Sequence, residues 1–249
     1  MLNTLLSCVS DAESSRRITK AVVSTAYCAV EVEGAGVGLC ANLSSGNNGF
    51  ECCFDRAGCL AGSTLKDLIA YNSGNGFVSR SLALAALNAV KADQIKGSSG
   101  DIFENISIKK STKVAMVGYI APVVRLIVDM GAELSIFERR DISSPLIHSP
   151  EEMPEILLSS EVVIVSATSI INDTLEEILG YTSGAEAVVL MGPSTPMAGG
   201  DIFAGSGVTW LAGASVADAS RAMEIVMEGG GTQALYRAGA LNKIIQKVY

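Results

Sequence analysis

The second half of the chain alternates short apolar segments with longer stretches in which apolar residues recur every three or four positions. The first pattern is typical of buried strands and the second of amphipathic helices. We expect strands over 113–117, 133–137, 162–166, 186–191 and 208–212, and helices over 121–130, 150–159, 173–180, 216–228 and 235–248. This order is that of a parallel sheet with right-handed crossovers, so the sequence predicts a Rossmann-like, doubly wound α/β domain.

The first half carries a different pattern. The expected elements are a polar helix over 11–20, a valine-rich strand over 21–33, a turn at 34–36, a second strand over 37–43, and helices over 63–71 and 77–92. A Gly- and Ser-rich linker over 96–101 leads to the second half. The sequence thus predicts a small α+β domain over 1–110 and the α/β domain over 111–249.

Composition supports a well-packed globule, because 49% of the residues are hydrophobic and only 18% are charged. No apolar run approaches the roughly 20 residues that a membrane span needs. The start of the chain lacks the basic region of a signal peptide. We therefore expect a cytoplasmic protein that does not contact membranes.

Charge is distributed unevenly between the two halves. Residues 1–110 carry 10 basic and 10 acidic side chains, whereas residues 111–249 carry 8 basic and 16 acidic ones. The net charge of -8 therefore comes entirely from the second half. An acidic surface repels phosphate backbones, so we expect no nucleic-acid partner.

All six cysteines lie within the first 59 residues: Cys8, Cys28, Cys40, Cys52, Cys53 and Cys59. Reduced, mostly buried thiols are the simplest interpretation, and a thiolate metal site is the alternative. Adjacent side chains such as those of Cys52 and Cys53 point in different directions on regular backbone, so they cannot easily share a tetrahedral ion. The single histidine, His148, is far away in sequence. The sequence gives a pre-formed zinc site little support.

The carboxyl ends of the predicted parallel strands carry the candidate ligand-binding residues, because ligands of such sheets bind beyond these ends. Glycines, prolines and hydroxyls there suit a small polar or anionic ligand. The predicted positions are Gly118, Tyr119, Glu138, Thr168, Asn172, Gly192, Pro193, Ser194, Thr195, Gly229, Gly230, Gly231 and Thr232. A stiff loop whose hydroxyls cap the next helix is an equally open interpretation of 192–195. For the glycines at 229–231, a structural role is favoured over ligand contact.

The 20-residue spacing from Gly118 to Glu138 imitates a dinucleotide fingerprint, with the acid placed for a ribose hydroxyl. The motif G-x-G-x-x-G is absent, however, and Pro122 removes an amide donor from the helix start. We therefore expect no dinucleotide. No serine or cysteine has an evident catalytic base, since His148 sits in a polar stretch, so catalytic residues and the existence of a reaction stay open.

Several of these segments together resemble a family of prokaryotic proteins of unknown function labelled "putative heavy-metal chelation". The matching stretches are GYIAPVVRLIVDMGAELSIFERR at 118–140, SATSIINDTLEEIL at 166–179, VVLMGPSTP at 188–196, LAGASVAD at 211–218 and EGGGTQALYRAG at 228–239, with GVGLCANL at 36–43 and LALAALNAV at 82–90. The resemblance implies an enolase-N-terminal-like domain followed by a Rossmann-like domain. It also implies a metal-related role, with a ligand site in the cleft between the domains.

Three hypotheses about function follow. The first is a metal-handling or small-ligand-binding protein, whose ligand lies in the interdomain cleft and whose cofactor, if any, is a divalent or heavy-metal ion. The second is an enzyme that places a nucleotide-type cofactor or substrate on the Rossmann-like domain, with Glu138 on a ribose. The third is an assembly module; a homodimer is expected and is compatible with all three.

Overall fold

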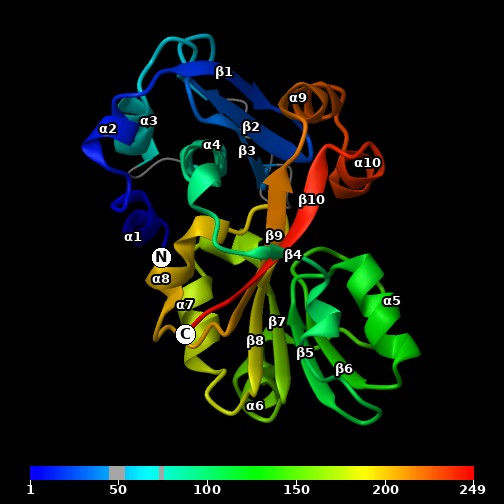
Figure 1. Cartoon of the computed structure of the whole chain (residues 1–249). Coiled ribbons are helices and arrows are strands. Elements are labelled where there is room, and N and C mark those ends of the chain that lie inside the picture. The colour runs from blue at the N-terminus through cyan, green and yellow to red at the C-terminus, as the bar shows by residue number, and fades with distance from the viewer. Residues whose placement is uncertain (45–53, 73–75) are drawn as a thin grey trace.

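The chain forms two sheets, one above the other (Figure 1). The computed structural model describes residues 1–44, 54–72 and 76–249. A three-stranded antiparallel sheet has the order β1-β2-β3, and a seven-stranded sheet has the order β4-β10-β9-β8-β7-β5-β6. This confirms the predicted α/β fold class. The domain boundary at 110/111 stays a prediction.

The small sheet consists of β1 (Ile18–Val23), β2 (Tyr27–Val32) and β3 (Gly36–Ala41). The expected single strand over 21–33 was wrong, because the chain turns at Ser24 and forms two strands. Ser24 N–H donates to Tyr27 O across this turn. The polar helix over 11–20 is also shorter than expected, since Ile18 is fully buried and already belongs to β1. The turn at 34–36 is confirmed, and Gly34 and Gly36 both have positive φ.

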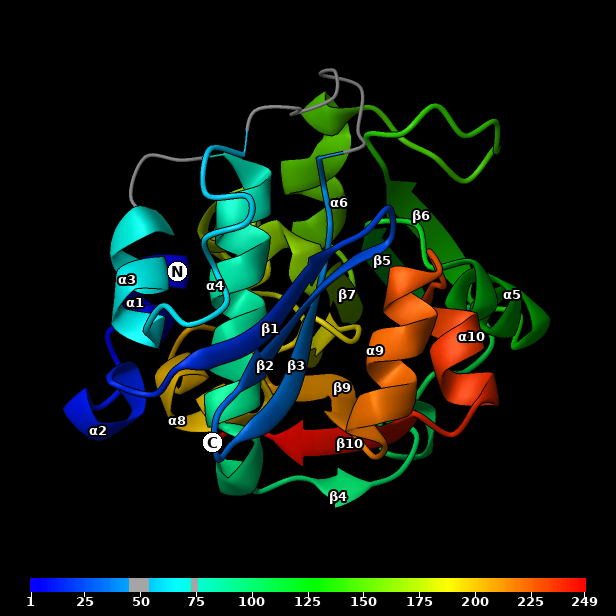
Figure 2. The same ribbon diagram turned by 90° about the horizontal axis from the view of Figure 1, so that it is seen from above.

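One helix of the first half, α4 (Phe77–Val90), covers one face of this sheet. The helices α1 (Leu2–Leu6) and α3 (Leu65–Asn72) pack on α4, and the short α2 (Asp11–Ser14) packs on α3. The apolar helix α4 crosses directly behind β2 and β3 (Figure 2). Gly38 allows this close packing, since a β-carbon there would lie 2.0 Å from Ala85 O. The helices expected over 63–71 and 77–92 are confirmed.

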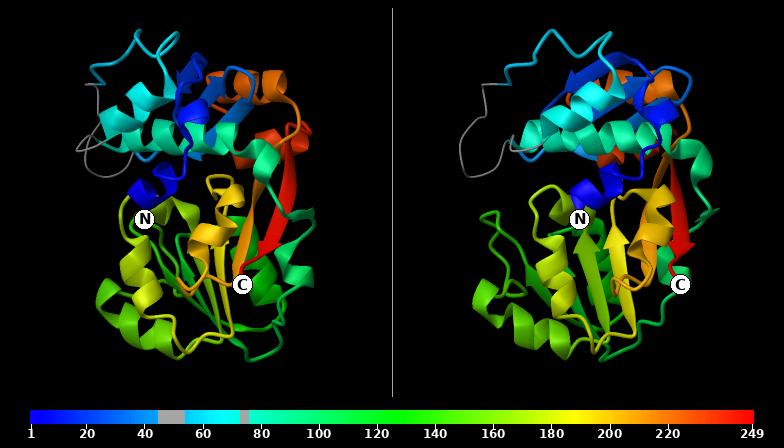
Figure 3. Two further views of the ribbon diagram at one scale, coloured as in Figure 1. Left: turned by 60° about the vertical axis from the view of Figure 1, so that its left-hand side comes forward. Right: turned by 90° about the vertical axis from the view of Figure 1, so that its left-hand side faces the viewer.

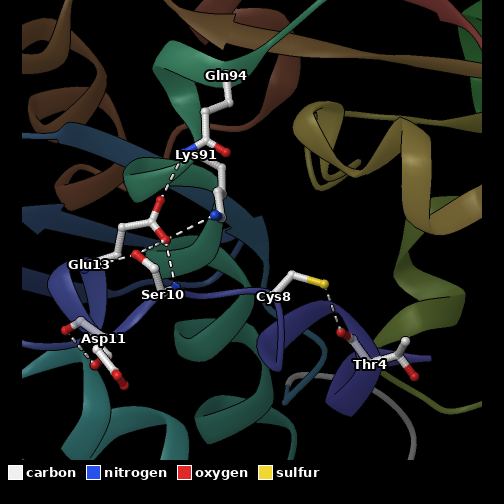
Figure 4. Close-up of polar contacts among 8 residues, drawn as sticks. Thr4, Cys8, Ser10, Asp11, Glu13, Lys91 and Gln94 are labelled. Atoms are coloured by element: carbon white, nitrogen blue, oxygen red, sulfur yellow. Dashed lines mark hydrogen bonds and ion pairs between the residues drawn. The ribbon is translucent and has the colours of Figure 1, made fainter.

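A buried carboxylate joins α2 to the end of α4 (Figure 4). Glu13 accepts hydrogen bonds from Lys91 Nζ at 2.9 Å, from Gln94 Nε2 at 2.8 Å and from Ser10 N–H at 2.8 Å. Burial raises the pKa of this carboxyl, but the hydrogen bonds outweigh burial and lower the pKa to about 2. The arrangement is structural, since it satisfies the N-terminus of α2 and neutralises Lys91.

The large sheet contains β5 (Lys113–Val117), β6 (Glu133–Phe137), β7 (Val162–Ser166), β8 (Ala187–Met191) and β9 (Trp210–Val216), all parallel. Two further strands extend it by antiparallel pairing: β10 (Leu241–Lys247) pairs with β9, and the short β4 (Ser98–Ser99) pairs with β10. The predicted strands are confirmed, although β9 continues past its expected end. The order reverses between β5 and β7, which is the topological switch point.

The expected helix over 235–248 was wrong. The chain instead forms α10 (Thr232–Arg237), turns at Gly239 with φ +68°, and returns as β10. β9 would otherwise expose a row of unpaired backbone groups, and β10 satisfies them along the register Leu241↔Val216 to Lys247↔Trp210. Pairing with a distant strand therefore outweighed local helix propensity.

Helices pack on both faces of the large sheet, on which inward positions alternate with a period of two. Val162 and Ile164 join the core under α5 (Ala121–Asp129), whereas Val163 and Val165 face the side of α6 (Met153–Leu158) and α7 (Leu175–Gly180). The short α8 (Gly200–Phe203) lies near α1 and the N-terminus (Figure 3). None of the helices in the described part of the chain has the length and apolar character that crossing a bilayer requires.

One helix of the second half covers the small sheet. α9 (Ala219–Met227) packs on β1, β2 and β3, and its Ala222 and Val226 share a core with Tyr27 and Leu39. The small sheet is thus sandwiched between α4 and α9. This contact holds the sheet above the carboxyl ends of the parallel strands.

Candidate functional site

A cleft of about 1860 Å³ lies between the small sheet and the carboxyl ends of the parallel strands. Ten of the predicted positions line it: Gly118, Tyr119, Glu138, Thr168, Asn172, Gly192, Pro193, Ser194, Gly231 and Thr232. Thr195, Gly229 and Gly230 do not. The segments after β5, β6, β7 and β8 therefore meet at one cavity, as parallel topology requires. That they bind a ligand stays a prediction.

The switch point between β5 and β7 forms the floor of the cleft. Gly118 has φ +92°, and a β-carbon there would lie 2.7 Å from the Ser166 β-carbon. Ser166 Oγ in turn lies 2.8 Å from Thr168 Oγ1. Glycine at 118 is required for both its conformation and this close approach.

Glu138 at the end of β6 is already engaged by the protein. Its Oε2 accepts from Tyr119 N–H at 2.8 Å and from Arg140 Nη2 at 2.7 Å, and its Oε1 accepts from Arg140 N–H at 2.9 Å. Burial raises the pKa of this carboxyl, but these three donors outweigh burial and hold the pKa at about 2. The carboxylate thus locks the loop after β5, and a ribose would have to compete with Tyr119 and Arg140 for it.

The start of α5 offers few backbone donors to a phosphate. Val123 and Val124 N–H groups both donate to Ile120 O, and Pro122 has no N–H group. The geometry that binds a pyrophosphate in dinucleotide folds is therefore poorly developed here.

Ser194 joins the two sheets. Its Oγ accepts from Ala41 N–H at 2.8 Å, a backbone donor on the free edge of β3. Asn88 Nδ2 bonds Leu39 O at 3.1 Å and Ser194 O at 3.4 Å on the same edge. Thr195, which is 1% exposed, does not line the cleft, and its hydroxyl has no hydrogen-bond partner. The 192–195 turn therefore serves domain contact as well as the cleft.

The glycines at 229–231 divide their roles. Gly229 N–H bonds Val226 O and Gly230 N–H bonds Ile225 O, which is a Schellman ending of α9. Position 230 must also lack a side chain, since a β-carbon on Gly230 would lie 2.4 Å from Ile225 Cγ2. Beyond this cap, Thr232 reaches the cleft and its Oγ1 lies 2.7 Å from Tyr27 Oη. Burial raises the pKa of Tyr27 to about 12, although the hydrogen bond to Thr232 acts in the opposite direction.

The loop after β7 is tied to the first half of the chain. Arg80 of α4 donates to Ile170 O at 3.3 Å and forms an ion pair with Asp173. Asp173 has φ +59°, a left-handed conformation that Asp tolerates better than most residues. Asn172 faces the cleft, and its Oδ1 accepts from Thr174 Oγ1 at 2.7 Å.

Charges in the cleft differ from those of the whole chain. Its described lining carries three carboxylates, Asp101, Glu138 and Glu177, and four cationic side chains, Arg139, Arg140, Arg237 and Lys243. Two of the carboxylates are paired, Asp101 with Lys243 at 2.7 Å and Glu138 with Arg140. The cleft therefore holds a local excess of positive charge in a chain whose net charge is -8.

Sequence reasoning missed Tyr27, Arg237 and Lys243, because they come from β2, α10 and β10, and nothing local in the sequence places them together. Arg139 and Arg140 could have been predicted from the sequence, since they directly follow Glu138 at a predicted strand end.

The donors of the cleft do not suit direct binding of a metal ion. Within the described ranges, no group of three His, Cys, Asp or Glu side chains could hold an ion. His148 lines the cleft, but its Nδ1 lies 3.4 Å from Glu152 Oε1 at the start of the next helix. Four cysteines are described: Cys8 and Cys59 are exposed and free, and Cys28 and Cys40 are buried and free. Cys52 and Cys53 lie outside the described residues.

Comparisons with known proteins agree with this architecture. A family model described as "Putative heavy-metal chelation" matches residues 101–245, and a second model with the same description matches residues 7–91. An uncharacterised protein of Methanocaldococcus jannaschii is 26% identical over 189 residues, which are 74% of this chain and 72% of that protein.

Two crystal structures of DUF364-family proteins of unknown function have this fold. The protein from Desulfitobacterium hafniense DCB-2 has a TM-score of 0.79 and 23% identity, over 99% of this chain and 96% of that chain. The protein from Pyrococcus horikoshii has a TM-score of 0.81 and 22% identity, over 99% of both chains. At these identities the likeness shows the fold alone.

Proposed function

This chain belongs to the DUF364 family, described as "Putative heavy-metal chelation", and from that premise we propose that its cleft binds a small, anionic metal-chelating molecule. The observation that carries the proposal is the excess of positive charge in the described lining of the cleft. A chelating molecule would bring its own donor atoms to a metal ion, which suits a cleft whose described residues lack a three-donor cluster.

The polar groups of the cleft suit such a ligand in two ways. Arg139 and Arg237 are exposed cations that would attract its carboxylates, and arginine binds carboxylates through paired hydrogen bonds. The hydroxyls of Thr168 and Thr232 would orient its polar atoms. We include in the same proposal that the other predicted residues lining the cleft contact this ligand.

A nucleotide-type cofactor or substrate is the second candidate, motivated by the spacing of Gly118 and Glu138 and by the parallel sheet. It is less favoured because Tyr119 and Arg140 occupy the acid that would contact a ribose. A homodimer and a cytoplasmic location also stay predictions.

Calorimetric titration of the whole protein tests the proposal. The probes are citrate and nitrilotriacetate, each with and without one equivalent of Ni²⁺, together with NiCl₂, NAD, ATP and S-adenosylmethionine. We expect the chelates or the free chelators to bind and NiCl₂ alone to bind weakly. The variants Arg139→Gln and Arg237→Gln should each weaken binding about tenfold, roughly 1.4 kcal/mol.

The matched control is Arg125→Gln on α5, an exposed arginine outside the cleft lining, which should leave affinity unchanged. Binding of NAD, ATP or S-adenosylmethionine with no binding of any chelator would favour the second candidate. If none of the probes binds, the proposal is wrong.

A further inference from the structure

Two cysteines face each other inside the small sheet, away from the cleft. Cys28 on β2 is directly opposite Cys40 on β3 in the antiparallel register. Directly opposed residues project from the same face of a sheet, here the face that α4 covers. Both side chains are 0% exposed, and both are free thiols.

The hydrogen-bonding pattern shows how far apart this pair is held. Asn42 N–H donates to Ala26 O, and Ala41 N–H points outward to Ser194, so hydrogen-bonded pairs fall at 26/42 and 28/40. In such pairs the β-carbons are about 5.5 Å apart, whereas a relaxed disulfide needs about 3.8 Å. Two metal–thiolate bonds of about 2.3 Å place sulfurs up to roughly 4.6 Å apart, which suits the wider spacing.

The surroundings restrict what could lie between the sulfurs. No cluster of three ligating side chains occurs in the described part of the chain, so a four-coordinate ion would lack donors. Burial raises the pKa of the Cys28 thiol to about 12 and raises that of Cys40 as well. Without a metal, the pair is therefore a pair of neutral thiols.

Charge balance selects the kind of cation. A divalent ion bound to two thiolates forms a neutral unit and releases one proton from each thiol. A neutral unit is far easier to bury than a net charge. Soft sulfur ligands favour soft cations, and with two donors the ion must accept linear, two-coordinate binding.

We propose that Cys28 and Cys40 form a buried two-thiolate site for a soft, divalent heavy-metal cation such as Hg²⁺. The site lies directly behind the cleft wall. Ala41, the residue after Cys40, lines the cleft, and the Ser194 and Ser81 hydroxyls lie beside the Cys40 sulfur. Ser81 is fully buried, and its hydroxyl makes no well-formed hydrogen bond. The site does not depend on the ligand proposed for the cleft.

The test uses the full-length chain with the other four thiols removed: Cys8→Ser, Cys52→Ser, Cys53→Ser and Cys59→Ser. This pair-only protein is titrated, fully reduced, with HgCl₂, CdCl₂ and ZnCl₂. We expect one Hg²⁺ to bind per chain and both thiols to stop reacting with a thiol reagent. X-ray absorption should show two sulfur neighbours around the Hg²⁺ ion and no nitrogen or oxygen neighbour. At 100-fold excess over Kd, the Tm should rise by roughly 5–10 °C. Cd²⁺ and Zn²⁺ should bind much more weakly.

Adding Cys40→Ala or, separately, Cys28→Ala should abolish the Tm rise, and circular dichroism verifies that each variant is folded. The proposal is overturned if the pair-only protein and these variants respond alike. It is also overturned if Hg²⁺ lowers the Tm, since the ion then binds the unfolded chain. Ready formation of a disulfide by the pair under diamide would contradict the spacing on which the site rests.

Discussion

Gly118 directly follows β5 and Ser166 ends β7, the two strands at which the large sheet reverses its order, and a β-carbon on Gly118 would lie 2.7 Å from the Ser166 β-carbon. Gly118 also has φ +92°, where other residues are strained. The floor of the cleft therefore depends on one absent side chain.

The variant Gly118→Ala should reduce the free energy of unfolding by about 2 kcal/mol, through strain at positive φ and the contact with Ser166. Urea denaturation measures this. Gly180→Ala is the control, since Gly180 ends α7, a β-carbon there would meet no atom within 4 Å, and the substitution should be neutral or slightly stabilising. Equal effects of the two substitutions would contradict the argument.

Glu138 should contribute to a loss of stability in acid. Its pKa in the folded protein is about 2, below the ordinary value of 4.5, so its contribution is complete above about pH 4.5 and is lost as the pH falls toward 2. Glu138→Gln should cost about 2 kcal/mol at pH 7, and its difference from the wild type should shrink between pH 4.5 and 2. Unfolding at several pH values measures it.

Glu133→Gln, at the exposed start of β6, is the control for that series and should stay within about 0.5 kcal/mol of the wild type throughout. A difference between wild type and Glu138→Gln that is constant with pH would show that the carboxylate is not held in its charged form.

Glu13→Gln should be more damaging, because Lys91 would then keep its charge in a site where its side chain is only 16% exposed. We expect a loss of about 3 kcal/mol at pH 7, seen as a drop in Tm. Arg221→Ala breaks a half-exposed ion pair with Glu224 and should cost less than about 1 kcal/mol. Similar losses for both would mean that the buried network of Figure 4 is no stronger than a surface pair.

Ser194 and Thr195 are neighbours with opposite hydrogen-bonding status. Ser194→Ala leaves Ala41 N–H without its acceptor and should cost about 1–2 kcal/mol. Thr195→Val removes a buried hydroxyl that has no partner and should be neutral or stabilising. Chemical denaturation of both variants measures the free energy of unfolding. A larger loss from Thr195→Val than from Ser194→Ala would contradict the hydrogen-bonding status assigned to the two hydroxyls.

The sequence by itself determined the elements whose signal is local. Strands such as Val162–Ser166 alternate between two cores, and the helical segment expected from residue 150 begins there, with Ser149 as its N-cap. Parallel topology then forces the strand ends together, which is why the eight predicted site residues that follow β5, β6, β7 and β8 line one cleft.

Only the tertiary structure decided the rest. The segment Leu241–Lys247 forms strand β10 because it pairs with β9, and no local sequence pattern predicts this pairing. Tyr27 and Arg237 reached the cleft, and Cys28 met Cys40, through packing and register between segments distant in sequence. Backbone propensity acts over a few neighbouring residues, whereas pairing and burial are settled only when the whole chain has found its partners.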